Sequence, residues 1–161
     1  MILVIGYGNS LCGDDGIGPH VVERLAAEAG QENDPPTEYL ALHQLTPELV
    51  EPISRADAVI FVDAEYGTTP GQITCSELSF SPSMIQGSSG AFTHHVNAPT
   101  LLETAMYLYD QRPTAYLYTM TGDNFDLGSS FSPAVELSLP CLLDELKARL
   151  AQCTNTALLK R

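Results

Sequence analysis

The stretch MILVIGYGNSLCGDDGIGP, residues 1–19, indicates the fold of the whole chain. An apolar run over residues 2–5 ends in a glycine loop over residues 6–9, and a helical pattern follows. A buried strand, a tight loop and a helix start in this order are typical of open α/β sheets. Such sheets keep their active sites at the carboxyl ends of the strands, which is where the adjacent acids Asp14 and Asp15 fall.

Strand-like and helix-like segments alternate along the rest of the chain. We expect strands over residues 2–6, 39–43, 58–62, 72–80 and 114–120, and helices over residues 17–29, 47–53, 99–109 and 133 to about 150. This alternation predicts a three-layer α/β/α sandwich around a mostly parallel sheet of about five strands. The loop that precedes residues 72–80 is too short for a crossover helix, so this strand is expected to run antiparallel to its neighbour.

The chain is expected to form one domain. Pro140 should kink or restart the last helix, because proline cannot donate the backbone hydrogen bond of a helix interior. We expect that helix to end near Leu150. The domain then covers residues 1–153, and residues 154–161 form a frayed tail.

The composition limits the classes of partner that the protein can bind. Its 161 residues carry a formal net charge of −13, and its only lysines are Lys147 and Lys160. A nucleic-acid backbone or an anionic membrane surface requires a cationic face, so neither is an expected partner. No basic segment precedes the first apolar run, and no apolar stretch is long enough to span a bilayer. We therefore expect a cytoplasmic protein, and a monomer.

The four cysteines have no spacing typical of a metal site. They are Cys12, Cys75, Cys141 and Cys153, and no two of them form a CxxC pair, so a structural zinc site is not expected. In a cytoplasmic chain we expect them to be reduced and buried.

The glycine loop over residues 6–9 does not match a phosphate-binding motif. Leu11 stands where a dinucleotide-binding motif has its third glycine, and the chain has no Gly-Lys-Ser/Thr sequence. The loop therefore serves a sharp turn, which the side chain of Asn9 can fix. Asp14 and Asp15 each have two interpretations, as a helix cap or as a functional acid in the cleft. One acid is sufficient for a cap, and the second favours function.

Asp63 and one of two adjacent histidines are further candidates. Asp63 ends the apolar strand over residues 58–62, so a rigid element would hold its carboxylate at the carboxyl edge of the sheet. His94 and His95 precede a helix, and because adjacent side chains point in different directions, only one is expected to serve the site. One imidazole and two carboxylates would form a metal site suited to zinc, nickel or manganese.

Five segments together resemble the [NiFe]-hydrogenase maturation endopeptidases. In chain order they are GYGNSLCGDDGIGP (6–19), HQLTPEL (43–49), VIFVDAEYG (59–67), THH (93–95) and NFDLGSSFSP (124–133). Each is short, but their order and spacing over residues 1–140 make the resemblance specific. HQLTPEL and NFDLG are most similar to the branch that serves soluble, bidirectional, NAD(P)-linked hydrogenases.

The resemblance implies an activity and a set of site residues. Members of this family remove a short C-terminal extension from the hydrogenase large subunit after nickel insertion, and their fold is an α/β/α sandwich. Two acids and one histidine bind metal in their cleft. In this sequence they correspond to Asp15, where many relatives have glutamate, to Asp63, and to His94 with His95 as the alternative. The implied reaction is nickel-assisted peptide hydrolysis, with the nickel supplied by the large-subunit precursor and Asp15 or Asp14 as a possible base acting through water.

Two other functions remain open at this point. A phosphoryl receiver domain also has two acids after its first strand and an aspartate after its third, here Asp14, Asp15 and Asp63. It needs a lysine after its last strand, however, and residues 119–123 are Thr-Met-Thr-Gly-Asp. The receiver therefore ranks well below the endopeptidase. The third possibility is a non-catalytic protein that binds the precursor.

Overall fold

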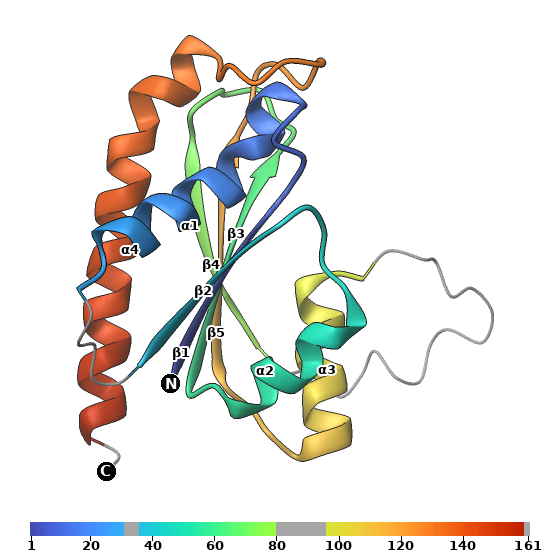
Figure 1. The fold of residues 1–161 in the computed structure, drawn as a ribbon, viewed down its shortest axis with the longest axis vertical. Coiled ribbons are helices and arrows are strands. Elements are labelled where there is room, and N and C mark those ends of the chain that lie inside the picture. The colour runs from blue at the N-terminus through green and yellow to red at the C-terminus, as the bar shows by residue number, and fades with distance from the viewer. Residues whose placement is uncertain (31–35, 80–95, 160–161) are drawn as a thin grey trace, which may run out of the picture.

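The computed structural model describes residues 1–30, 36–79 and 96–159 (Figure 1). Its strands are β1 (Ile2–Tyr7), β2 (Thr37–Leu42), β3 (Ala58–Glu65), β4 (Ile73–Leu78) and β5 (Thr114–Thr121). Its helices are α1 (Ile17–Glu28), α2 (Val50–Arg55), α3 (Ala98–Tyr109) and α4 (Pro133–Leu159), with 3-10 turns η1 (Gly13–Gly16) and η2 (Pro47–Leu49). The strands form one sheet in the order β2-β1-β3-β5-β4. The predicted alternation of strands and helices is confirmed.

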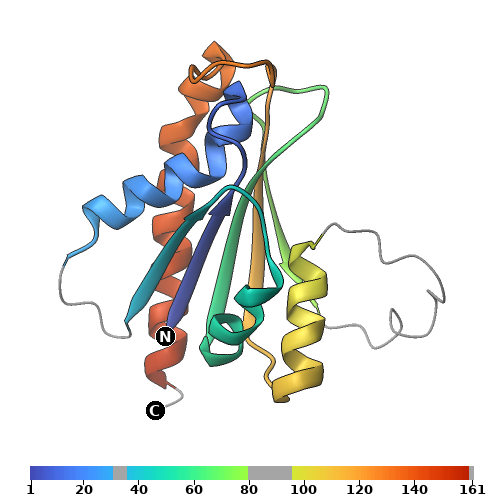
Figure 2. The same cartoon turned by 45° about the vertical axis from the view of Figure 1, so that its right-hand side comes forward.

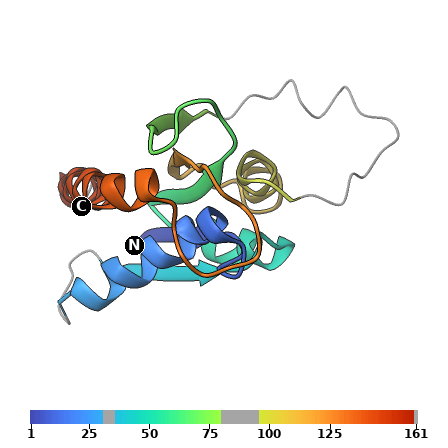
Figure 3. The same cartoon turned by 90° about the horizontal axis from the view of Figure 1, so that it is seen from above.

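Helices cover both faces of the sheet, as the predicted three-layer sandwich requires. Seen from above, α1 and α4 lie on one side of the strands, and α2 and α3 lie on the other (Figure 3). Along β1, Ile2 and Val4 pack toward α1 and α4, whereas Leu3 and Ile5 pack toward α2 and α3. Because both faces of this strand are buried, its sequence is uniformly apolar instead of alternating.

Close packing brings α1 onto the sheet. A Cβ atom on Gly18 would lie 2.5 Å from the carbonyl oxygen of Val62 and 2.6 Å from that of Tyr7, so a larger residue would push the helix away. The first turn of α1 is thereby held directly against the ends of β1 and β3, which is where the candidate acids lie.

The strand directions create a crevice at one edge of the sheet. β2, β1, β3 and β5 are parallel, and β4 is antiparallel to β5, as predicted for that strand. From β1 the chain passes through α1 to β2 on one side, and it then passes through α2 to β3 on the other side (Figure 2). Such a reversal leaves a crevice outside the carboxyl ends of β1 and β3, where open α/β sheets bind ligands.

The last helix differs from the prediction. α4 continues through Pro140 to Leu159, so the expected end near Leu150 is wrong. Cys153 and Ala157 are buried on its final turns, and their contacts explain why the helix continues. Small side chains four residues apart are a weak helical pattern, so the sequence does not signal these final turns. The division into a domain to residue 153 and a tail stays a prediction.

The cysteines are only partly as expected. All four are free, but Cys153 alone is buried, Cys12 is half-buried, and Cys75 and Cys141 are exposed. Their general burial was therefore a wrong expectation. Within the described ranges, no helix combines the length and apolarity needed to cross a bilayer.

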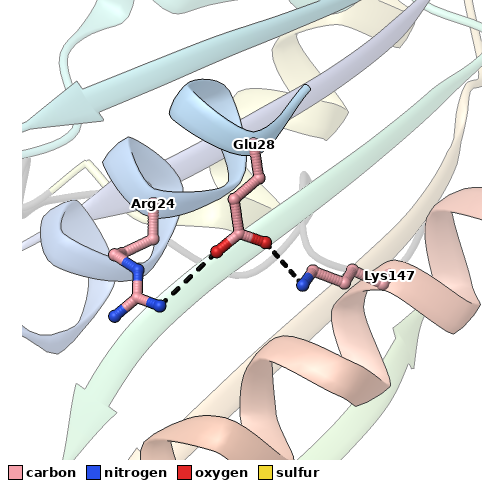
Figure 4. A network of polar contacts seen from close by, with 3 residues as sticks. All are labelled: Arg24, Glu28 and Lys147. Carbon is pink, nitrogen blue, oxygen red and sulfur yellow. Dashed lines mark hydrogen bonds and ion pairs between the residues drawn. The ribbon is translucent and has the colours of Figure 1, made fainter. Parts of the chain in front are cut away.

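Surface ion pairs join α1 to α4. Glu28 lies between Arg24 of its own helix and Lys147 of α4, at 3.4 and 2.5 Å (Figure 4). All three side chains are about half exposed, so solvent screens these pairs and they contribute little to stability. The buried apolar side chains between the helices and the sheet are the main source of the contact.

Candidate active site

A pocket of about 260 Å³ opens at the carboxyl ends of β1 and β3. Its lining consists of Tyr7, Gly8, Asp15, His43, Gln44, Leu45, Asp63 and Val96. Two of the predicted site residues, Asp15 and Asp63, are therefore brought together from positions 48 residues apart in the chain. His94 and His95 lie outside the described residues, but Val96, which directly follows them, lines the pocket.

The turn after β1 presents Asp15 to the pocket. The backbone N–H of Asn9 donates to Oδ2 of Asp15 at 2.7 Å, and Oδ1 of Asn9 accepts from the N–H of Leu11 at 3.0 Å. The predicted role of Asn9 in fixing the turn is confirmed. Gly8 has a φ of 142°, and a Cβ atom there would lie 2.0 Å from the carbonyl oxygen of Asp15. The turn can hold Asp15 in this position only because residue 8 is glycine.

Asp63 is held by the rigid strand β3. Its Oδ1 accepts from the N–H of Ala64 at 2.8 Å, and the hydroxyl of Tyr7 interacts with its carboxylate. Burial raises the pKa of Asp63 to about 6, and the negative charges of Asp15 and Glu65 act in the same direction. A carboxylate that is poorly solvated and faces other acids favours binding of a proton or a metal cation.

Asp14 has a different role from its neighbour. It is fully buried, and Oδ2 accepts from the N–H groups of Asp123 at 2.7 Å and Asn124 at 3.0 Å, while Oδ1 accepts from that of Ser132 at 2.7 Å. Burial alone would raise the pKa of Asp14, but these hydrogen bonds outweigh it and lower the pKa. Its carboxylate thus binds the loop before α4.

Both interpretations of Asp14 from the sequence need correction. Neither η1 nor α1 has a side-chain hydrogen bond at its N-cap, so the helix-capping role is wrong. Asp14 does not line the pocket, and its two oxygens are already occupied, so it is not available as a base. The acid that faces the pocket from this turn is Asp15.

Three polar residues of the pocket were not predicted. Tyr7 is the last residue of β1, and His43 and Gln44 directly follow β2. Burial and the negative charge of Asp63 raise the pKa of Tyr7, so its hydroxyl stays protonated and can donate a hydrogen bond. Their position in the sequence could have indicated them, since all three stand where a parallel strand ends.

The pocket contains two of the three residues that the sequence predicts as metal ligands. Carboxylate oxygens from Asp15 and Asp63 suit a divalent cation, and nickel or zinc would also favour an imidazole nitrogen. Within residues 1–30, 36–79 and 96–159, no group of three His, Cys, Asp or Glu side chains is arranged to hold a metal ion. The described residues therefore supply two of the three predicted ligands.

A second pocket, of about 140 Å³, lies at the opposite end of the sheet, between the strands and α4. Asp57 and Arg149 are the charged residues among those described in its lining, and neither Asp15 nor Asp63 is part of it. The guanidinium of Arg149 already has a hydrogen-bond partner, because its Nε donates to the hydroxyl of Tyr118 at 3.1 Å. The candidate site is therefore the pocket that contains Asp15 and Asp63.

No protein-family model and no curated protein sequence matches the chain. Its structure is similar to that of the hydrogenase maturating endopeptidase HybD from Escherichia coli, with a TM-score of 0.71 and 22% identity over 94% of this chain and 92% of that one. The maturation protease HycI from Thermococcus kodakarensis has a TM-score of 0.69 and 20% identity, over 96% of this chain and 92% of that one.

A hydrogenase 2 maturation peptidase from a Thaumarchaeota archaeon is also similar. Its TM-score is 0.66, and it is 23% identical over 92% of this chain and 97% of its own. At these identities the similarity establishes a common fold over nearly the full length of each chain.

Proposed function

We propose that this protein is an endopeptidase that removes a C-terminal extension from the large-subunit precursor of a [NiFe] hydrogenase. The observation that carries the proposal is that Asp15 and Asp63 line one pocket at the carboxyl ends of two neighbouring strands. The common fold with proteins named as hydrogenase maturation proteases supports it. So do the five sequence segments that resemble this family.

The proposed reaction is hydrolysis of an amide next to a metal that the substrate brings. Nickel bound to the precursor supplies Lewis-acid activation of the scissile carbonyl or of a water molecule. Asp15 and Asp63 are the proposed protein ligands that hold the ion at the pocket, and His94 is the third, with His95 as the alternative. The enzyme's contribution is then to position the metal-bearing segment against the scissile bond.

Hydrolysis also requires a group that moves a proton. The hydroxyl of water adds to the carbonyl carbon, the carbon–nitrogen bond breaks, and the second proton of the water passes to the leaving amine. Asp14 is occupied by backbone hydrogen bonds, so a base acting through water would be Asp15. Its Oδ2 is already oriented by the N–H of Asn9.

The hydrogenase served is proposed to be a soluble, bidirectional, NAD(P)-linked one. The segment HQLTPEL, which favours this branch, contributes His43, Gln44 and Leu45 to the lining of the pocket. Residues typical of the branch are thus in a position to contact the substrate. We further propose that the enzyme acts as a monomer in the cytoplasm, where precursors of such hydrogenases would be found.

The receiver-domain alternative is disfavoured by the structure. A receiver places both acids of its first loop beside the third-strand aspartate, whereas Asp14 lies outside the pocket. Receiver sheets also have the order 2-1-3-4-5, whereas this sheet has the order β2-β1-β3-β5-β4 with an antiparallel edge strand. The non-catalytic alternative is separated from the endopeptidase by measurement of cleavage.

The test is co-expression of the chain with candidate large-subunit precursors, followed by mass measurement of the large subunit. The proposal predicts loss of the mass of the C-terminal extension from one precursor only when this chain is present. A precursor that binds the chain and keeps its full mass would favour the non-catalytic alternative. Purified enzyme should also cleave nickel-loaded precursor and leave nickel-free precursor intact. Equal cleavage of both would remove the substrate-borne metal from the mechanism.

A further inference from the structure

Two loops lie side by side above the carboxyl edge of the sheet. One is the turn over residues 8–16, after β1, and the other is the segment over residues 122–132, between β5 and α4 (Figures 1 and 3). We call these two segments the rim. The rim borders the candidate active site, because Gly8 and Asp15 belong to both.

Hydrogen bonds lock the two segments of the rim together. The N–H of Gly128 donates to the carbonyl of Leu11 at 2.8 Å, and the N–H of Gly13 donates to the carbonyl of Gly128 at 2.7 Å. The buried carboxylate of Asp14 adds the three bonds to the backbone of the second segment described above. The rim is therefore a fixed surface with few conformations to lose when a partner binds.

Two leucines stand exposed on this fixed surface. Leu11 is 66% exposed and Leu127 is 88% exposed, and they lie next to the backbone bonds that join the two segments. Nearby, Tyr66 is 82% exposed and its ring lies 4.2 Å from that of Phe125, which belongs to the rim. Large apolar side chains gathered on a restrained surface are typical of protein–protein contacts.

The charges of the rim all have one sign. Its exposed carboxylates are those of Asp123 and Asp126, whereas Asp15 is half-buried and Asp14 is buried, and the rim contains no lysine or arginine. The seven basic residues of the chain lie elsewhere in the sequence: Arg24, Arg55, Arg112, Lys147, Arg149, Lys160 and Arg161. An acidic surface of this kind attracts a basic face and repels an acidic one.

A groove connects the rim to the acid pocket. It has a volume of about 340 Å³, and Leu11 and Asn9 line it together with residues 41–43 at the end of β2. Gly8 and His43 line both the groove and the acid pocket, so the two cavities share a wall. A chain segment that reaches the acids can therefore remain in contact with a body seated on the rim.

We propose that the rim docks the folded body of the substrate protein, through a face on which apolar side chains are surrounded by lysines or arginines. Leu11 and Leu127 are the apolar anchors, and the exposed acids Asp123 and Asp126 pair with the basic groups. This inference rests on the proposed function. The inference goes beyond the proposed function in one respect: the enzyme recognises the folded protein that carries the scissile segment, and not that segment alone.

The test is Leu127→Ser, with Leu159→Ser as the matched control. Leu159 is 89% exposed and lies at the opposite end of the molecule, on the last turn of α4. Cleavage of a fixed precursor should show a KM raised about tenfold in Leu127→Ser, with kcat unchanged, because an interface anchor is lost and the acids are not. Leu159→Ser should match the wild type in both constants.

A charge variant tests the second part of the proposal. Asp126→Lys should slow association with the precursor about tenfold at low salt, and the difference should shrink as salt is added. Asp144→Lys, on the exposed side of α4, is its matched control and should cause a smaller change.

The inference and the proposed function fail in different ways. If the wild-type enzyme leaves every precursor uncleaved, the function is wrong. If it cleaves a precursor and Leu127→Ser has an unchanged KM, lowers only kcat, or behaves like Leu159→Ser, the rim is not the docking surface. Equal slowing by Asp126→Lys and Asp144→Lys would likewise overturn the role of the rim charges.

Discussion

The two ends of the sheet differ in how they hold charge. At the amino end, the carboxylate of Asp57 pairs with the N-terminal amine, and the guanidinium of Arg149 lies 4.2 Å from the ring of Tyr116. Both of these charged groups have a stabilising partner. At the carboxyl end, Asp15 and Asp63 share one pocket, and no lysine or arginine is among the described residues that line it.

This difference separates a stabilising arrangement from a functional one. Two carboxylates in a poorly solvated pocket repel each other, which destabilises the fold. Such repulsion is typical of functional sites, where the carboxylates bind a cation or a reacting group. The fold compensates beside the pocket, where the buried Asp14 accepts three backbone hydrogen bonds. The hydrogen-bonded carboxylate of Asp14 thus stabilises the loops beside the pocket in which Asp15 and Asp63 repel each other.

The largest expected effect comes from exchanging a carboxylate for an amide at each end. Asp63→Asn should lower kcat/KM for the precursor by about 1,000-fold or more, because it removes a charged donor from the metal site. Asp57→Asn, at the exposed amino end, should leave cleavage unchanged. The rates are measured by mass analysis of the precursor, with circular dichroism to verify that both variants fold. Normal cleavage by Asp63→Asn would place the chemistry elsewhere.

The second comparison is between the adjacent acids. Asp14→Ala leaves three backbone N–H groups without their acceptor and should lower the free energy of unfolding by about 3–5 kcal/mol. Asp15→Ala removes one hydrogen bond to a half-buried carboxylate and should lower it by about 1 kcal/mol. Urea unfolding measures both values. Equal losses would show that Asp14 has no special structural role.

The unpaired charge at the carboxyl end should also appear in the pH dependence of stability. The pKa of Asp63 is about 6 in the folded protein and near 3.8 in the unfolded chain. The folded state therefore binds the proton more tightly, and this group stabilises the fold at low pH and loses that effect as the pH rises from 4 to 7. Asp63→Asn lacks this titration.

The measurement is urea unfolding of both proteins at pH 4 and pH 7 in the presence of a chelator. The stability of Asp63→Asn relative to wild type should be greater at pH 7. Contributions from acids that do not face Asp63, such as Asp14 with its lowered pKa, are common to the two proteins and cancel in the difference. A difference that stays constant with pH would mean that Asp63 is not destabilised by its surroundings.

The smallest effect is expected at the amino end. Arg149→Met keeps most of the side-chain volume but removes the contact with Tyr116 and the hydrogen bond to Tyr118, at a cost of about 1 kcal/mol. Thermal unfolding should register this loss, and precursor cleavage at a fixed temperature should not change. A loss of cleavage without a loss of stability would show that the amino end of the sheet also takes part in function.

The sequence predicts those features that depend on local pattern. The apolar run over residues 2–5 and the ends of the strands are local, and they are sufficient to find Asp15 and Asp63. The partners of Asp14 are not local, because they lie more than a hundred residues away in the chain. For that reason the local pattern could not distinguish Asp14 from Asp15, and Asp15 was selected as the ligand only through the family resemblance.

Weak or absent patterns account for the other differences. The final turns of α4 bury only small side chains, which resemble a polar tail in sequence. His43 was not considered because it stands alone after an edge strand, without a second ligand at a typical spacing. The histidine of the predicted donor set, His94 or His95, lies outside the described residues and stays a prediction.

A double-mutant cycle on Asp15 and Asp63 tests most directly whether the two acids act on the same substrate-borne ion. Cleavage of nickel-loaded precursor is measured for the wild type, Asp15→Asn, Asp63→Asn and the double variant. If the acids act as one unit, the double variant should be about as impaired as the worse single variant, because the first substitution already disrupts the shared site. If the loss of cleavage rate in the double variant equals the product of the two single losses, the carboxylates act independently, and the shared site is contradicted.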